Sequence, residues 1–356
     1  MKLNIAVLPG DGIGPEVTAQ AIKAVKAVCM RFRHELSTQE APVGASAIEA
    51  AGNPYPEETH ALCMASDAVL FGAIGAPGYD NDPSARIRPE QGLLAMRKRL
   101  ELYANIRPVT AFASLLHHSP LRPELVEGVD LLCLRELTGG LYFGQPQGRS
   151  EDGQTAYDTC VYSRREIDRI VRLACEYALL RRRKVTVVDK ANVLATSRLW
   201  RQVAQEIAGE YPSVETEYMF VDNAAMRLVR WPKSFDVIVT ENMFGDILTD
   251  EASVIAGSLG MLPSASVGVH TSVFEPVHGS YPQAAGKNIA NPVAAILSAA
   301  LMFEYAFRQP DEGRAIRRAV AASIEAGAVT EDITCTHPRS TSDVGDWIAE
   351  RILSQE

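Results

Sequence analysis

Short apolar runs followed by turn residues recur along the chain and predict buried strands. The first run, at residues 3–8, leads through a glycine-rich turn into a predicted helix over residues 17–28. Further runs that predict strands lie at residues 68–72, 130–134, 184–189, 218–221 and 235–239. Helices are expected to begin near residues 89, 242 and 293. This succession of strands and helices predicts an α/β protein.

The stretch at residues 240–253 organises the rest of the chain, because it follows a strand-like run and opens a helix. Asp246 and Asp250 are four residues apart, so their carboxylates share one helical face with Ser253. Like charges at this spacing cost roughly a few tenths of a kcal/mol, which favours a nearby cation. Two solvated acids in the first turn fit the pattern equally well. The opposite face is interpreted as core and carries Phe244, Ile247, Leu248, Val254 and Ile255.

The predicted helix at residues 89–98 carries a mixed stripe. Glu90, Leu93, Leu94 and Arg97 occupy positions i, i+3, i+4 and i+7, so they lie on one face. The leucines suit an ordinary core, with Arg97 as a surface charge that reaches past it. The same stripe also suits a pocket with an apolar wall and a cationic clamp for a carboxylate.

Several charged residues stand at or near the ends of predicted strands. Arg107 and Arg135 are of the type that binds carboxylates through paired N–H bonds, so their convergence would indicate a di- or tricarboxylate ligand. Lys190 lies where a strand passes into a helix, the edge at which α/β proteins place their sites, and Asp222 is expected to end a strand. The segment at residues 137–162 has turn residues at its centre and is interpreted as a long hairpin or arm.

Two loops are candidates for ligand binding. The glycine-rich turn at residues 9–16 could approach a phosphate, but Pro15 stands where the dinucleotide fingerprint requires glycine. A tight turn before a helix explains this segment at least as well. The loop at residues 274–292 is rich in Gly, Ser, Pro and Asn, which is typical of a connector or of a binding loop. A lone histidine such as His278 is more often structural than catalytic.

Composition narrows the possible classes of protein. The 356 residues suffice for two domains, and 47% hydrophobic content supports a sizeable core. A net charge of −9 argues against a nucleic-acid partner. No apolar run reaches membrane-spanning length and no targeting segment is evident, so neither a membrane nor an export route is expected. The six cysteines are scattered without a Cys-x-x-Cys pair, which indicates reduced, buried thiols in a cytoplasmic protein.

In their order and spacing, these motifs resemble the β-decarboxylating dehydrogenase family, which includes isocitrate, isopropylmalate, homoisocitrate and tartrate dehydrogenases. The resemblance runs from residues 8–17 almost to the C-terminus and is most specific at residues 105–109, 135–144, 189–194, 242–250 and 275–292. It implies a non-Rossmann, two-domain α/β fold. Residues 1–102 and 257–356 would form the cofactor-binding domain. Residues 103–256 would be the inserted substrate, metal and dimerisation domain, with an arm at about 137–162.

The resemblance also implies roles for individual residues. Tyr142 would protonate the enol product and Lys190 would take the hydroxyl proton. Mg²⁺ or Mn²⁺ would be held by Asp222, Asp246 and Asp250, since hard cations prefer oxygen ligands. The substrate would contact Glu90, Leu93, Leu94, Arg97, Arg107, Arg135 and Asp222. The cofactor NAD would be held by Ile13, His278, Gly279, Ser280, Tyr281, Pro282, Gln283, Ala284, Ala285, Gly286, Asn291 and Asp332.

The expected reaction is the NAD- and metal-dependent oxidative decarboxylation of 3-isopropylmalate to 4-methyl-2-oxopentanoate in leucine biosynthesis, carried out by a homodimer with shared active sites. Leu93 and Leu94 suit an isopropyl group better than the extra carboxylate of isocitrate. Homoisocitrate, isocitrate and tartrate or malate remain alternative substrates, and a non-catalytic metal- or anion-binding scaffold is the alternative of another class. Gln283 departs from the Asp that NAD-dependent members commonly carry there, so the discrimination against NADP is open.

Overall fold

The computed structural model describes residues 1–80 and 87–354. The described chain divides into two compact units. Residues 1–102 and 257–354 form the first, and residues 103–256 form the second. None of the described helices is long and apolar enough to cross a membrane.

The first unit is built on five strands in the order β2-β1-β3-β12-β11. The pairs β1–β2, β1–β3 and β3–β12 are parallel, and β11–β12 is antiparallel. The strands span Lys2–Gly10 (β1), Glu35–Glu40 (β2), Ala68–Ala73 (β3), Pro263–Gly268 (β11) and Val273–Pro276 (β12). The helices span Gly14–Phe32 (α1), Ala45–Ala51 (α2), Glu57–Ala65 (α3), Pro77–Asp80 (α4), Pro89–Arg99 (α5), Leu259–Met261 (η5), Pro282–Ala284 (η6), Val293–Tyr305 (α11), Pro310–Glu325 (α12) and Thr341–Ser354 (α13).

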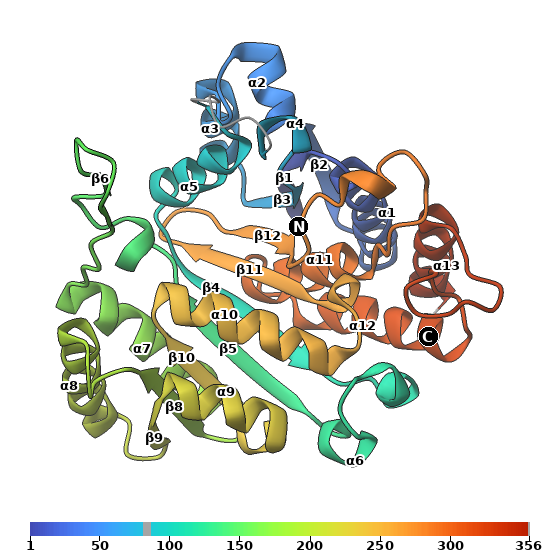
Figure 1. Ribbon diagram of the computed structural model, residues 1–356. Coiled ribbons are helices and arrows are strands. Elements are labelled where there is room, and N and C mark those ends of the chain that lie inside the picture. The colour runs from blue at the N-terminus through green and yellow to red at the C-terminus, as the bar shows by residue number, and fades with distance from the viewer. Residues whose placement is uncertain (81–86, 355–356) are drawn as a thin grey trace. The chain divides into compact units, whose positions relative to one another are not determined.

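Helix α11 forms the centre of this unit. It is apolar all round and buried from Val293 to Phe303, as expected of a helix that is covered on every side. Helices α1 and α12 pack against it, and α13 packs on α1 (Figure 1). The buried faces of β1 and β3 complete the core, so the apolar runs at residues 3–8 and 68–72 form strands as predicted.

The glycine-rich turn between β1 and α1 is held against the loop that follows β12. Gly12 has a φ of 59°, and a Cβ atom there would lie 2.0 Å from the backbone oxygen of Ser280. The backbone N–H of Ile13 donates to that oxygen at 2.8 Å. Only glycine permits both the left-handed backbone and this approach. The turn thereby fixes Ile13 beside residues 278–281.

The second unit also has five strands, in the order β4-β5-β10-β8-β9. The pair β4–β5 is antiparallel and the others are parallel. The strands span Leu102–Thr110 (β4), Asp130–Glu136 (β5), Lys184–Asp189 (β8), Glu215–Phe220 (β9) and Val237–Thr240 (β10), and Gly148–Arg149 (β6) pairs with Ala156–Tyr157 (β7) in a separate ribbon. The helices span Ala113–His118 (η1), Pro123–Val126 (α6), Gly140–Tyr142 (η2), Arg164–Leu179 (α7), Ala195–Glu210 (α8), Val221–Arg230 (α9), Pro232–Ser234 (η3), Asn242–Ser253 (α10) and Val254–Ala256 (η4).

The carboxyl ends of β5, β10 and β8 meet at one edge of this sheet. Thr240 is in register with Arg135 on one side and with Val188 on the other. Helices α7 and α8 cover one face of the sheet, and α9 and α10 cover the other (Figure 1). The chain moves outward from β5 through β8 to the edge strand β9 and then back to β10. Because crossovers between parallel strands are right-handed, the helices of the outward path and of the return path lie on opposite faces. The residues that follow these strands are therefore brought together.

Three expectations from the sequence are wrong. Asp222 does not end a strand, because β9 stops at Phe220 and Asp222 lies in the first turn of α9. Ile247 and Val254 are not core, since they are 59% and 46% exposed. Cys335 is exposed rather than buried, whereas four of the other cysteines are buried.

Candidate active site

Helix α10 begins with a cap that its own sequence supplies. The side chain of Glu241 accepts a hydrogen bond from the backbone N–H of Phe244 at 2.8 Å. This bond satisfies one of the amide groups that a helix leaves unpaired at its start. Asp246 and Asp250 then project from the second and third turns of the helix, toward Arg135 of β5 and Arg107 of β4.

Arg135, at the end of β5, passes directly under α10. Its side chain is 2% exposed, and its Nε donates to the backbone oxygen and the Oδ1 of Asn242 at 2.9 and 3.0 Å. Its Nη1 donates to Oδ1 of Asp246. A Cβ atom on Gly245 would lie 2.6 Å from Cγ of Arg135, so the helix needs glycine here to admit the arginine.

Arg107, on β4, reaches the next turn of the same helix. Its Nη1 donates to Oγ1 of Thr249 at 2.6 Å and to Oδ1 of Asp250 at 3.0 Å, and its Nε donates to Oδ1 of Asn105 at 2.7 Å. Its Nη2 lies 3.8 Å from Oδ1 of Asp246. Two guanidinium groups therefore offset the repulsion between the two aspartates, which answers the question that their spacing left open.

Tyr142 joins this cluster from the η2 turn. Its hydroxyl donates to Oδ2 of Asp246 at 2.9 Å, and its ring centroid lies 5.8 Å from Cζ of Arg135. Burial, and secondly the charge of Asp246, raise the pKa of the Tyr142 hydroxyl above its usual value. The group therefore stays protonated at neutral pH and can donate a proton.

A buried network fixes the segment that carries Tyr142. The hydroxyl of Tyr162 donates to Oε2 of Glu241 at 2.9 Å and accepts the backbone N–H of Asn242 at 2.9 Å. The Nδ2 of Asn242 donates to the backbone oxygen of Gly139 at 3.1 Å. Glu136 accepts the backbone N–H of Gly139 at 2.7 Å. Sequence reasoning assigned no role to these residues, although a tyrosine at the end of the predicted arm was a signal.

Lys190 and Asp222 form a second, separate pair. The Nζ of Lys190 donates to Oδ1 of Asp222 and lies 5.9 Å from the ring centroid of Phe220. The hydrogen bond from Lys190 is the main cause that lowers the pKa of Asp222. Within residues 103–256, no hydrogen bond or ion pair joins this pair to Asp246 or Asp250. No group of three acidic, His or Cys residues suited to a metal occurs among the described residues of the single chain.

In the first unit, the stripe of Glu90, Leu93, Leu94 and Arg97 lies outside the fully buried side of α5. The buried side of the helix carries Pro89, Gly92 and Met96, whereas Leu93 and Leu94 are only partly buried and Glu90 is exposed. The Nη2 of Arg97 lies 3.8 Å from Oε1 of Glu275. The leucines are therefore available as an apolar wall, and the alternative in which they fill the core is not supported.

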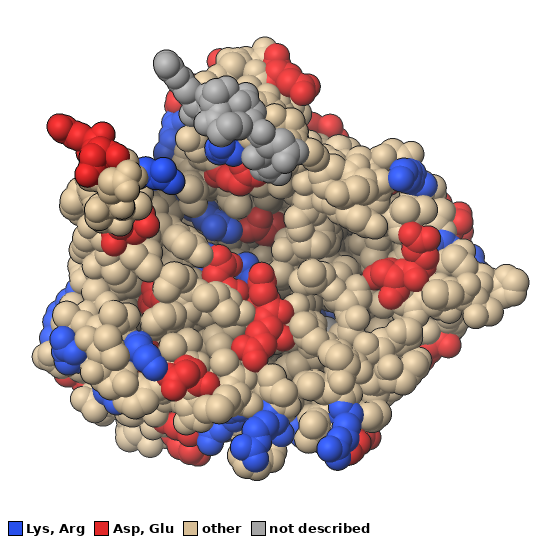
Figure 2. Space-filling model, in the orientation of Figure 1, with Lys and Arg blue, Asp and Glu red and all other residues tan. Residues whose placement is uncertain are grey.

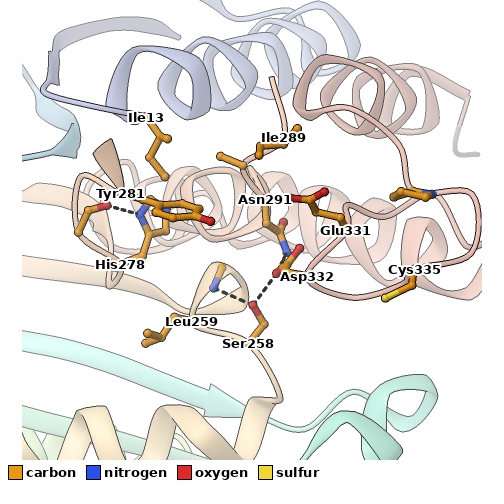
Figure 3. Close-up of a pocket in the computed structure, with 14 residues that line it drawn as sticks. Ile13, Ser258, Leu259, His278, Tyr281, Ile289, Asn291, Glu331, Asp332 and Cys335 are labelled. Carbon is orange, nitrogen blue, oxygen red and sulfur yellow. Dashed lines mark hydrogen bonds between the residues drawn. The ribbon is translucent and has the colours of Figure 1, made fainter. Parts of the chain in front are cut away.

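A pocket of about 790 Å³ lies in the same unit (Figure 3). Six of the residues expected to hold the cofactor line it, namely Ile13, His278, Gly279, Tyr281, Asn291 and Asp332. Six others are not among the lining residues, namely Ser280, Pro282, Gln283, Ala284, Ala285 and Gly286. Sequence reasoning missed further lining residues, namely Ser258, Leu259, Gly260, Ile289, Ala290, Glu331, Cys335 and Pro338.

The loop at residues 282–288 is fastened to α1. Both oxygens of the Glu16 carboxylate accept backbone N–H groups, one from Gly286 and the other, at 3.1 Å, from Asn288. Tyr281, just before this segment, has a φ of 38° and lines the pocket. The chain thus turns sharply at Tyr281, and the residues after it are held against the helix.

Asp332 organises one wall of the pocket. Its Oδ2 accepts the hydroxyl of Ser258 at 2.6 Å and the Nδ2 of Asn291 at 3.0 Å (Figure 3). Its Oδ1 accepts the hydroxyl of Thr330 at 2.6 Å. Three donors occupy this carboxylate, so its main effect is to position Ser258 and Asn291.

His278 leaves one nitrogen available on the pocket's other side. Its Nδ1 lies 2.9 Å from the backbone oxygen of Gly279, which accepts the Nδ1–H. Its Nε2 is buried without a hydrogen-bond partner among the described residues. Burial lowers the pKa of His278, so the ring is neutral and Nε2 is an acceptor. An acceptor in a largely apolar pocket suits an amino group on a flat aromatic ligand such as adenine.

Comparison with known proteins places the chain in a family. The family model described as isocitrate/isopropylmalate dehydrogenase matches residues 4–348. The chain belongs to the isocitrate/isopropylmalate dehydrogenase family. The expected family, the α/β fold class and the enzyme class of β-decarboxylating dehydrogenase are thereby confirmed. Dehydrogenases of this family generally use a nicotinamide dinucleotide and a divalent metal ion.

Individual relatives agree with this assignment. A 3-isopropylmalate dehydrogenase of Bacteroides fragilis is 58% identical over 354 residues, which cover 99% of both proteins. One from Bacillus subtilis is 51% identical over 362 residues, covering 100% of this chain and 98% of the relative. The crystal structure of isocitrate dehydrogenase from Methylococcus capsulatus matches with a TM-score of 0.87 and 36% identity over 99% of both chains.

Proposed function

We propose that the protein oxidises and decarboxylates 3-isopropylmalate to 4-methyl-2-oxopentanoate, with NAD and Mg²⁺ or Mn²⁺, in leucine biosynthesis. The observation that carries this proposal is the cluster in which Arg107 and Arg135 meet Asp246, Asp250 and Tyr142. The cluster brings guanidinium donors for carboxylates and a protonated tyrosine to the face of α10 that carries two carboxylates. The relatives named 3-isopropylmalate dehydrogenase support the choice of substrate.

The substrate would be held by charge at one end and by apolar contact at the other. Arg107, Arg135 and Arg97 would bind the malate carboxylates, since guanidinium groups match carboxylates bidentately. Leu93 and Leu94 are partly exposed and would contact the isopropyl group. An isocitrate carboxylate would meet no polar side chain at these two positions. This contrast favours the branched, apolar substrate.

Asp246 and Asp250, with Asp222, would hold the metal ion, because carboxylate oxygens are the ligands that Mg²⁺ and Mn²⁺ prefer. When bound, the metal supplies Lewis-acid stabilisation of the negative charge that develops on the substrate oxygen. The two arginines keep both carboxylates in place beforehand.

Two side chains would move protons. Lys190 would accept the proton of the substrate hydroxyl. NAD, when bound, would supply the acceptor for the hydride of the carbon that carries this hydroxyl. Tyr142 would then protonate the carbon from which CO₂ has left. Its raised pKa keeps it in the form that can donate, and Asp246 orients its hydroxyl.

The pocket of the first unit would bind the adenosine half of NAD. Its lining is mainly apolar, with Ile13, Leu259 and Ile289 available to contact the adenine ring. The Nε2 of His278 would accept a hydrogen bond from the adenine amino group. Asn291 and Ser258, both held by Asp332, would provide further polar contacts.

We further propose a homodimer in which Lys190 and Asp222 of one chain complete the site formed by its partner. In the single chain no hydrogen bond or ion pair joins this pair to Asp246 or Asp250. Ile247 of α10 and Val254, the first residue of η4, are exposed, and between them in the sequence lies Glu251, whose pKa is raised by burial. A second copy across a two-fold axis would cover these residues and deliver the missing carboxylate. The free, mostly buried cysteines suit a cytoplasmic location.

The test follows NAD reduction by the purified protein at saturating Mn²⁺, with 3-isopropylmalate, isocitrate and tartrate compared side by side. We expect the highest kcat/KM with 3-isopropylmalate and no turnover after chelation of the metal. A higher value with isocitrate would overturn the substrate, and full activity in chelator would overturn the metal role.

A further inference from the structure

A second, smaller cavity adjoins the cofactor pocket. It measures about 240 Å³ and is lined by Lys287, Asn288, Ile289, Glu331, Pro338, Arg339 and Ser340. Three of these residues, Ile289, Glu331 and Pro338, also line the larger pocket. Figure 3 shows Glu331 beside Asn291 and Ile289 on the wall of the larger pocket. Glu331 therefore stands at the boundary between the two cavities.

Lys287 and Glu331 are not engaged elsewhere in the described chain, whereas Arg339 also stabilises the charge of Asp343. In the part of the chain that the structure describes, neither Lys287 nor Arg339 forms an ion pair, and Glu331 has no hydrogen-bond partner. The two cations would attract a phosphate placed in the small cavity, whereas the carboxylate would repel it. The balance between them decides whether an anionic group is accepted there.

Neither Gln283 nor Asp332 can supply a free negative charge to the larger pocket. Gln283 is neutral and exposed and is not among the residues that line either cavity. The carboxylate of Asp332 already accepts three hydrogen bonds. Among the described residues that line the larger pocket, Glu331 is the acid with free acceptor oxygens.

We propose that Glu331 is the residue that selects NAD over NADP. Its carboxylate accepts hydrogen bonds from the ribose hydroxyls of the adenosine and repels a phosphate on the 2′-oxygen. Without this charge, Lys287 and Arg339 would make the small cavity a phosphate site. The inference rests on the proposed function, since it assumes that the larger pocket holds the adenosine of a dinucleotide.

The experiment compares wild type with Glu331→Gln by calorimetric binding of ADP and 2′,5′-ADP, and by kcat/KM for NAD and NADP. We expect the ratio of 2′,5′-ADP to ADP affinity to rise on the order of tenfold in the variant, the change that about 1.4 kcal/mol produces. The kcat/KM ratio should move in the same direction. Adding Lys287→Gln to the variant should remove most of the gain.

Glu325→Gln is the matched control, because Glu325 is an exposed acid of α12 outside both cavities. Glu331→Ala repeats the loss of charge with a different side chain. Ratios within twofold of wild type in both Glu331 variants would overturn the inference, and so would an equal gain in Glu325→Gln. Wild-type protein that discriminates between the two ADP compounds but oxidises no isopropylmalate would contradict the proposed function alone.

Discussion

The cofactor pocket of the first unit and the arginine–aspartate cluster of the second unit are built in opposite ways. The pocket is an open cavity of about 790 Å³ in which His278 keeps an unpaired acceptor and Asp332 holds the polar wall. In the cluster, by contrast, every charged side chain is engaged by another. The pocket thus offers unpaired groups to a ligand, whereas the charged groups of the cluster are already paired with one another.

The balance of charges in the cluster explains why its side chains can pair with one another without a bound ligand. Two arginines face two aspartates, so the group is close to neutral and its charges are paired. A substrate with two carboxylates and a divalent cation together add no net charge. Binding of both would exchange ion pairs within the protein for ion pairs with the ligands, which limits the cost of desolvation.

The largest effect is expected from Asp246→Asn, which should impair the arginine–aspartate cluster and leave the pocket of the first unit unaffected. The amide keeps the volume of the side chain but loses the anionic ligand, so metal-dependent turnover should fall by about 10³-fold or more. NAD affinity should be unchanged, because the pocket lies in the other unit. Activity at saturating Mn²⁺, circular dichroism and NAD titration measure the three properties. Near-normal turnover would refute the metal assignment.

The second prediction concerns the part of the site that one chain lacks. Lys190→Ala and Asp250→Asn should each be inactive, but mixing them after reversible dissociation should restore about a quarter of wild-type activity. Half of the randomly formed dimers are mixed, and each of these has one intact site by two-fold symmetry. Continued inactivity despite confirmed subunit exchange would show that both groups act in one chain.

A smaller effect is expected from Leu94→Ser, which tests the apolar wall on α5. Each methyl group buried contributes about 0.8 kcal/mol, so losing contact with an isopropyl group should lower kcat/KM for 3-isopropylmalate by roughly tenfold. Turnover of malate should change little, because it has no branch to bury. Equal losses for both substrates would instead indicate that Leu94 supports the fold.

The smallest effect is expected from Tyr162→Phe, which removes one hydroxyl from the network behind Tyr142. The backbone N–H of Asn242 and one oxygen of Glu241 would each lose a partner, a change of about 1–2 kcal/mol. We expect kcat to fall several-fold while the KM for NAD stays constant. A lower melting temperature with unaltered kcat would assign Tyr162 to stability alone.

Periodicity along the chain predicted the elements of the site better than their contacts. The spacing of Asp246 and Asp250 placed both on one face of a helix, as the structure has them. Their pairing with Arg107 and Arg135 was beyond reach, because it depends on the pairing of β4, β5 and β10 and on the close approach at Gly245. These are contacts between residues more than 100 positions apart.

The wrong and missing predictions also arise because the local sequence does not show contacts between distant parts of the chain. A helical stripe shows which residues lie on one side of α10 and η4, but not whether the chain itself covers that side. Periodicity therefore wrongly predicts Ile247 and Val254 as core. Asp222 follows an apolar run, yet a helix starts one residue earlier. The wall formed by Ser258, Leu259 and Glu331 joins two loops distant in sequence, and no local pattern marked it.

Asn291 supports both the start of a buried helix and the wall of the pocket, so the effects of substituting it differ from those of substituting Glu331. Its Oδ1 accepts the backbone N–H of Val293 at the start of the buried helix α11, while its Nδ2 belongs to the cofactor pocket. Replacement there would disturb folding and ligand together, so this position tolerates little variation. Glu331 is exposed and forms no hydrogen bond or ion pair within the described chain, so its replacement would leave the fold intact. A substitution at Glu331 would therefore change the proposed choice of cofactor without disturbing the pocket wall that Asn291 supports.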